Sequence, residues 1–110
     1  MIPDFEVRTV HHDGQATLFV RGEIDIAVHK RFVDALQAAQ DESTDVVVDL
    51  TEVTFIDSAG ISALMRGYKD ATDPSRLRLV GVRPSIRRVL EITGVAHLLL
   101  EVPTPNRTDP

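Results

Sequence analysis

The chain has 110 residues, of which 43% are apolar and 26% are charged, as is usual for one globular domain. Its formal net charge of −5 argues against a nucleic-acid partner, because phosphate binding needs a clustered basic surface. Cysteine is absent, which excludes disulfides and cysteine metal sites. No apolar stretch is long enough to span a bilayer and no basic signal peptide begins the sequence, so we expect a soluble cytoplasmic protein without membrane insertion.

The first forty residues predict a hairpin followed by a helix. Apolar and polar residues alternate over 5–11 and 16–21, and the Asp13-Gly14 pair between them is typical of a type I′ turn. From Val28 the apolar residues recur every three or four positions, which indicates the first helix. The polar run 41–45 then leads into the next strand.

Residues 46–68 carry the strongest functional signal. The β-branched run at residues 46–50 predicts a buried strand, and residues 51–56 are expected to form a loop. A helix is then expected to begin at residues 57–60 and to end near Asp70. Ser58 is therefore expected at the beginning of a helix, where unpaired N–H groups and partial positive charge accept an anion, including a phosphate on that serine. Its small neighbours, Ala59 and Gly60, leave the hydroxyl open to approach. These features indicate a switch.

The remaining residues predict a strand–helix unit, a short last strand and a tail. We expect a strand at 77–80, a helix from Pro84 to a C-cap at Gly94, and a last strand at 97–102. Residues 103–110 have almost nothing to bury and predict a disordered tail, so the domain spans 1–102. Strands alternating with helices after an initial hairpin predict an α/β fold with a small mixed β-sheet, its helix-linked strands parallel.

Ser58 has two other interpretations. Serine is among the best N-cap residues, so Ser58 can be a plain helix cap, unless Asp57 is the cap and frees the hydroxyl to face solvent. A hydrolase nucleophile is disfavoured, because the G-x-S-x-G elbow needs glycine where Ile56 stands. Of the histidines, only His97 follows Ser58 in the chain order of such hydrolases. We therefore expect no enzymatic activity.

Other polar groups give no site. His11 and His12 point to opposite faces of a strand and cannot easily chelate one metal ion. No glycine-rich phosphate loop occurs, so we expect no nucleotide cofactor. A late arginine cluster is interpreted as a solvated edge of an acidic protein, with docking of an acidic partner as the alternative. The cluster consists of Arg76, Arg78, Arg83, Arg87 and Arg88.

Three segments in order carry a resemblance to a known family. They are residues 20–25 (VRGEID), residues 57–60 (DSAG) after an apolar strand, and residues 79–84 (LVGVRP) followed by a short helix and 93–95 (TGV). Together they resemble the anti-sigma factor antagonists of the bacterial STAS domain family, over most of residues 5–102. The resemblance implies a single STAS domain, a small mixed sheet with helices packed mainly on one face. A second hydroxyl residue, frequent in the family, is replaced here by Ala59.

The resemblance also implies a function, partner switching. The unphosphorylated protein would bind an anti-sigma factor and free its sigma factor. That anti-sigma factor would also be a serine kinase that phosphorylates Ser58 and ends binding, and a serine phosphatase would reset the switch. A partner-binding patch is implied, in which Ser62 and Arg66 share the polar side of the Ser58 helix. The expected patch contains Asp25, Asp57, Ser58, Ala59, Gly60, Ser62 and Arg66.

Two points stay open from the sequence. STAS domains also serve as non-switching subunits of signalling scaffolds or membrane transport complexes, which is the rival function. Gly60 allows close backbone approach, by a partner or by the neighbouring strand, and Gly60→Val is expected to weaken partner binding while the domain stays folded.

Overall fold

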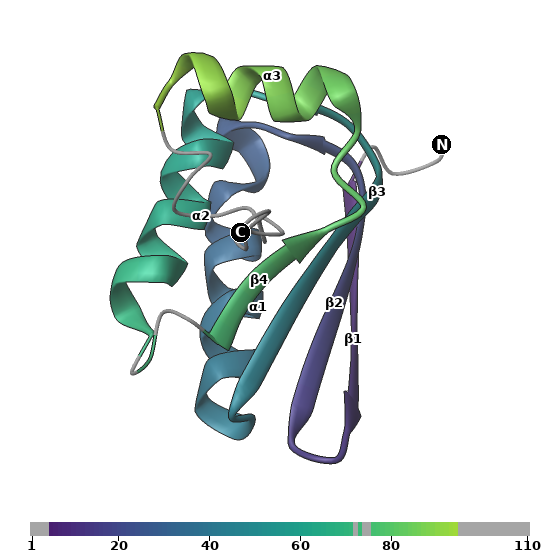
Figure 1. Ribbon diagram of the computed structural model, residues 1–110, viewed down its shortest axis with the longest axis vertical. Coiled ribbons are helices and arrows are strands. Elements are labelled where there is room, and N and C mark those ends of the chain that lie inside the picture. Colours follow the sequence, from purple (N-terminus) through teal and green to yellow (C-terminus); the bar gives the residue numbers. More distant parts are fainter. Residues whose placement is uncertain (1–4, 72, 74–75, 95–110) are drawn as a thin grey trace, which may run out of the picture.

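The computed structural model describes residues 5–71, 73 and 76–94, which form a four-stranded sheet, three α-helices and a short 3-10 helix (Figure 1). In chain order these elements are β1 (Phe5–His12), β2 (Gln15–Ile24), η1 (Ile26–Val28), α1 (His29–Glu42), β3 (Asp45–Ile56), α2 (Ser58–Asp70), β4 (Leu77–Val80) and α3 (Pro84–Ile92). The predicted last strand at 97–102 and the tail at 103–110 lie outside the described residues.

The sheet is mixed, with the strand order β1-β2-β3-β4. β1 and β2 are antiparallel, whereas β2–β3 and β3–β4 are parallel pairs. The hairpin turn has positive φ at both central residues, 50° at Asp13 and 80° at Gly14, which is the requirement of a type I′ turn. The predicted turn and the α/β class with a mixed sheet are confirmed.

The helices lie mainly on one face of the sheet, as expected. Figure 1 shows α1 and α2 side by side along this face and α3 across one end of the sheet. Apolar side chains from both layers fill the space between them. Its centre consists of Leu18, Val48, Leu50, Phe32, Leu36 and Leu64, each at most 1% exposed. The opposite face of the sheet carries exposed side chains, including Arg8 above the ring of Phe19, 4.8 Å from its centroid.

The predicted loop at 51–56 is wrong, because β3 continues to Ile56. Its pairing with β2 runs to Ile24 opposite Ile56, with register shifts between Phe19 and Arg21 and between Gly22 and Glu23. The irregular register breaks simple alternation: Val53 and Ile56 are buried, with two exposed residues between them. Because these irregularities interrupt the two-residue alternation of a strand, the sequence pattern of 51–56 resembles that of a polar loop. β2 extends three residues beyond its predicted end at Arg21, because these residues pair with the last part of β3.

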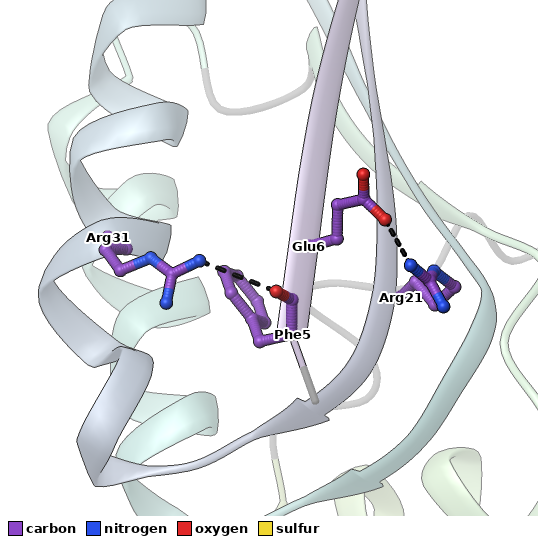
Figure 2. A network of polar contacts seen from close by, with 4 residues as sticks. All are labelled: Phe5, Glu6, Arg21 and Arg31. Carbon is purple, nitrogen blue, oxygen red and sulfur yellow. Dashed lines mark hydrogen bonds and ion pairs between the residues drawn. The ribbon is translucent and has the colours of Figure 1, made fainter. Parts of the chain in front are cut away.

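Side chains hold the start of β1 from both sides (Figure 2). On the helix side, Arg31 of α1 lies 5.0 Å from the ring centroid of Phe5 and donates a hydrogen bond to its carbonyl oxygen at 3.5 Å. On the other side, Arg21 of β2 forms an ion pair with Glu6, and this hydrogen bond and charge lower the pKa of the Glu6 carboxyl. Both members of the pair are exposed, so the pair contributes little stability.

The later elements agree with the sequence pattern. α2 ends at Asp70, β4 spans the predicted strand, and α3 begins at Pro84 with Ile86 and Leu90 buried. Gly94 follows α3 with a φ of 80° and donates its N–H to the Glu91 carbonyl at 3.1 Å, as a glycine C-cap does. No helix in the described part of the chain is long and apolar enough to cross a membrane.

Candidate functional site

The predicted site residues lie where two parallel strands end beside each other. Ile24 of β2 pairs with Ile56 of β3, and the next residues along the chain are Asp25 and Asp57. The N–H of Asp57 donates a hydrogen bond to the Ile24 carbonyl at 3.2 Å, so the two loops are joined directly. In sheets with parallel strands, binding sites form at this carboxyl edge. The structure therefore brings Asp25 and the Ser58 loop together.

Asp57, and not Ser58, caps the α2 helix. The Oδ1 atom of Asp57 accepts hydrogen bonds from the N–H groups of Ala59 at 2.9 Å and Gly60 at 3.1 Å. Asp57 itself has an extended backbone, as an N-cap residue does. Ser58 is the first helical residue, and its side chain is exposed. The plain-cap interpretation of Ser58 is therefore wrong, and its hydroxyl is open to solvent.

Asp25 plays the same local role in the neighbouring loop. Its Oδ1 atom accepts a hydrogen bond from the N–H of Ala27 at 3.0 Å and so caps the 3-10 helix η1. Two carboxylates therefore stand at two helix starts, where the partial positive charge of the backbone N–H groups stabilises them. They also give the site an acidic character before any phosphate is added.

Gly60 lies beneath the site and not on its surface. A Cβ atom at this position would lie 2.5 Å from Cγ1 of Ile56 and 2.7 Å from the carbonyl oxygen of Ile24. The close approach that the sequence predicts is therefore made by the neighbouring strands. Gly60→Val is therefore expected to destabilise the domain as well as to weaken partner binding, because the larger side chain collides with backbone that cannot move aside cheaply. Gly60 positions the two loops against each other.

The rest of the predicted patch follows the outer side of α2. Ser62 and Arg66 are exposed and continue from Ser58 at steps of four residues, which places them on one side of the helix. Arg66 forms an ion pair with Asp70 at 3.1 Å between Nε and Oδ2. Ala59 is half-buried beside the cap. Ser58, Ser62 and Arg66 therefore form a continuous polar ridge.

The sequence interpretation missed two apolar residues beside the site. Ile26 in η1 is 75% exposed and Phe55 near the end of β3 is 46% exposed. The sequence predicts a loop at 51–56, and the orientation of the Phe55 side chain does not follow from a loop. Once β3 is known to reach the buried Ile56, the alternation of an extended strand places Phe55 on the other side.

The histidines that the structure describes give no sign of a catalytic or metal centre. His11 lies at the opposite end of the β1–β2 hairpin from Ile24, where its Nδ1 atom is 3.1 Å from the Ser43 hydroxyl. Among the described residues there is no group of three metal-ligating side chains. His97 lies outside the described residues.

Comparison with known proteins agrees with this geometry. The family model described as "Mlab, STAS domain" matches residues 7–101. The anti-sigma-B factor antagonist of Listeria monocytogenes is 33% identical over 84 residues, which cover 74% of each chain. This chain belongs to the STAS domain family. The anti-sigma-B factor antagonist of Staphylococcus epidermidis is 29% identical over 98 residues, covering 87% of this STAS domain chain and 91% of the relative.

Solved structures share the fold of this STAS domain. The crystal structure of an anti-sigma factor antagonist from Mycobacterium paratuberculosis has a TM-score of 0.81 and 28% identity, and the match covers 96% of this chain and 92% of that one. The anti-sigma factor antagonist SpoIIAA in its unphosphorylated form has a TM-score of 0.67 at 17% identity, over 94% and 91% of the two chains. The second likeness shows the fold alone. The predicted fold and family are confirmed.

Substitution of Gly60 by alanine tests whether the strand ends and α2 pack as closely as the structure indicates. Gly60→Ala should lower the free energy of unfolding by roughly 1–3 kcal/mol, because the added methyl overpacks the joint. Gly67→Ala is the matched control in the same helix. Its Cβ would meet the flexible end of Leu36 at 3.1 Å, and alanine favours the helix by up to about 1 kcal/mol. Equal unfolding free energies of the two variants in urea would contradict this packing.

The cap gives a second test. Asp57→Ala removes both hydrogen bonds to the first turn of α2 and should cost roughly 0.5–2 kcal/mol in urea unfolding. Asp57→Ser keeps a capping oxygen and should retain most of that stability. An alanine variant as stable as the wild type would show that Asp57 is not the cap.

Proposed function

We propose that this protein is an anti-sigma factor antagonist that is switched at Ser58. Its unphosphorylated form binds an anti-sigma factor and frees the sigma factor that the anti-sigma factor holds, and phosphorylation of Ser58 ends binding. The relatives named anti-sigma-B factor antagonist and the Mycobacterium paratuberculosis anti-sigma factor antagonist support this class of function. The observation that carries the residue assignment is the exposed Ser58 hydroxyl, which Asp57 releases from the capping role.

The chemistry of the cycle belongs to the partners. In this proposal the anti-sigma factor is also a serine kinase that uses ATP from its own pocket, and a separate serine phosphatase removes the phosphate. The protein itself is a cytoplasmic regulatory binding protein, not an enzyme, and needs no cofactor. It supplies the surface that the partner binds and the Ser58 hydroxyl, which lies at the first residue of α2.

The binding surface in this proposal combines the two loops and the ridge on α2. Asp25, Asp57, Ala59, Ser62 and Arg66 surround Ser58, and Gly60 acts from beneath by fixing the loops. The joint between Ile24 and Asp57 supports their placement in one patch. The surface therefore exists before a partner arrives, which reduces the entropy cost of binding.

A phosphate on Ser58 changes this surface without requiring a change of fold. It adds roughly −1.5 to −2 charge at neutral pH, and the partial positive charge at the N-terminus of α2 stabilises it where it stands. The patch already holds the carboxylates of Asp25 and Asp57. Burying a hydrated dianion there without a matching cation costs several kcal/mol, which lowers affinity by about two orders of magnitude or more.

The rival function as a constitutive transport or scaffold subunit has weaker support. A sulfate transporter family protein from Wolinella succinogenes shares the fold at 22% identity, which speaks for the fold alone. The Listeria monocytogenes and Staphylococcus epidermidis relatives, at 33% and 29% identity, are named for anti-sigma factor antagonism. The exposed serine at the start of α2 is a feature that switching uses and a constitutive contact does not need.

Phosphorylation and binding can be measured together. The protein is incubated with its cognate kinase and ATP, the label is mapped, and the affinity of each form for the anti-sigma factor is measured by calorimetry. Phosphorylation should fall on Ser58 and weaken binding by about 100-fold or more. Ser58→Asp should reproduce part of the loss, because it adds charge without the size of a phosphate. Ser58→Ala should bind permanently and accept no label.

Thr9→Ala is the control, since it removes an exposed hydroxyl on β1, outside the proposed binding surface. It should be phosphorylated like the wild type. Label on Thr51, Thr54 or Ser62 in place of Ser58, or equal affinity before and after modification, would overturn the proposal.

A further inference from the structure

Large apolar side chains reach solvent at five positions in the described part of the chain, and two of them lie within three residues of Asp25 or Ser58 in the sequence. These five are Val10, Phe19, Ile26, Phe55 and Ile92. Ile26 has the highest exposure of the five, at 75%. A single exposed apolar residue is ordinary, whereas apolar residues that gather at one site mark a contact surface.

Ile26 and Phe55 are tied to the joint between the two loops. The hydrogen bond from the Asp57 N–H to the Ile24 carbonyl is the centre of this joint. Ile26 lies two residues after Ile24, and Phe55 lies two residues before Asp57. Phe55 also pairs with Glu23 across the β2–β3 ladder. Both apolar residues therefore occupy the same two loops and strand ends as Asp25 and Ser58.

The backbone around both residues is fixed, so their exposure is not the result of a frayed end. Ile24, two residues before Ile26, and Ile56, directly after Phe55, are buried at 0% and 3% exposure. The Asp25 carboxylate caps η1 directly before Ile26, and the ladder with β2 holds Phe55. A rigid apolar surface loses little conformational entropy when it is covered.

We propose that Ile26 and Phe55 form an apolar anchor that seats in an apolar recess of the anti-sigma factor, next to Ser58. This inference rests on the proposed function, because it takes the partner of the Ser58 patch as its occupant. Continuity with that patch favours the anti-sigma factor over any other occupant. Apolar side chains at the centre of an interface carry much of its affinity, while charges at the edge set its specificity.

A second copy of this chain fits the anchor poorly. A two-fold contact places the same residues of both copies opposite each other. Glu23 pairs with Phe55 across the ladder, Asp25 directly precedes Ile26, and Asp57 lies two residues after Phe55, so two copies would bring six carboxylates together. Like charges facing each other disfavour such a contact. The occupant is therefore a protein with an apolar recess and a rim that is not acidic.

The anchor and the serine have different tasks in this arrangement. The anchor sets how slowly the complex dissociates, since most affinity differences in related complexes arise in the dissociation rate. The charge on Ser58 decides whether the anchor can be covered at all, because seating it buries the serine beside it. Substitution of the anchor should therefore weaken the unphosphorylated complex while the hydroxyl remains intact.

The test compares Ile26→Ser and Phe55→Ser with Phe19→Ser, by calorimetry and by stopped-flow or surface-plasmon kinetics against the purified cognate anti-sigma factor. Phe19 is the matched control, since it is 38% exposed and lies on the open face of the sheet, away from the loops. Each anchor substitution should raise Kd by about tenfold or more, mainly through faster dissociation. Phe19→Ser should stay within about threefold of the wild type. Circular dichroism and urea unfolding establish that each variant is folded, and Ile26→Ser, at a 75% exposed position, carries the test if Phe55→Ser is unstable.

The outcomes separate this inference from the proposed function. Normal binding by both anchor variants, together with weak binding by Ser58→Asp, would overturn the anchor and leave the switch intact. Equal weakening by Phe19→Ser would also overturn it, because the effect would not be local. A wild-type protein that does not bind the anti-sigma factor would refute both. A wild-type dimer in sedimentation that Phe55→Ser dissociates would identify a second copy as the occupant and refute the anchor.

Discussion

The hydrogen bond between the Asp57 N–H and the Ile24 carbonyl joins the end of β3 to the end of β2, and the site depends on this joint. Gly60 makes the joint possible, because any side chain there would meet Ile24 and Ile56 within 3 Å. The Asp57 carboxylate then closes the first turn of α2 and leaves the Ser58 hydroxyl exposed. Two loops far apart in the sequence thus become one rigid surface at the end of the sheet.

This arrangement separates the groups that stabilise the fold from the serine that we propose as the switch. The core lies between the sheet and the helices, and Leu50, Leu64 and their neighbours are fully buried there. Ser58 contributes its backbone to α2 and its hydroxyl to solvent. In the proposed mechanism a charge added to that hydroxyl lies at the positive end of α2 and in water, so the surface changes while the core does not.

Local chemistry explains which features the sequence could predict. The Asp13-Gly14 turn, the helix start at Asp57 and Ser58, and the helix start at Pro84 depend on neighbours in the chain, and the structure confirms them. The strand at 51–56 was missed because β3 carries one extra residue at each of two register shifts against β2, and no local pattern records these shifts. The sequence also could not say whether Gly60 packs against a partner or against the neighbouring strand, because its contacts with Ile24 and Ile56 depend on how the strand ends meet. Phe55 and Ile26 became recognisable only when both strand ends were known.

The distinction between a change of surface and a change of fold can be tested by nuclear magnetic resonance of the protein before and after phosphorylation. Amide chemical shifts and hydrogen-exchange protection are measured in both forms under the same buffer. If Ser58 acts through its surface, shift changes should be confined to the loops around Asp25 and Ser58 and to the first turns of α2, with the protection of β2, β3 and the rest of α2 unchanged. Loss of protection along β3 or α2 in the phosphorylated form would show that the switch works by unfolding part of the domain.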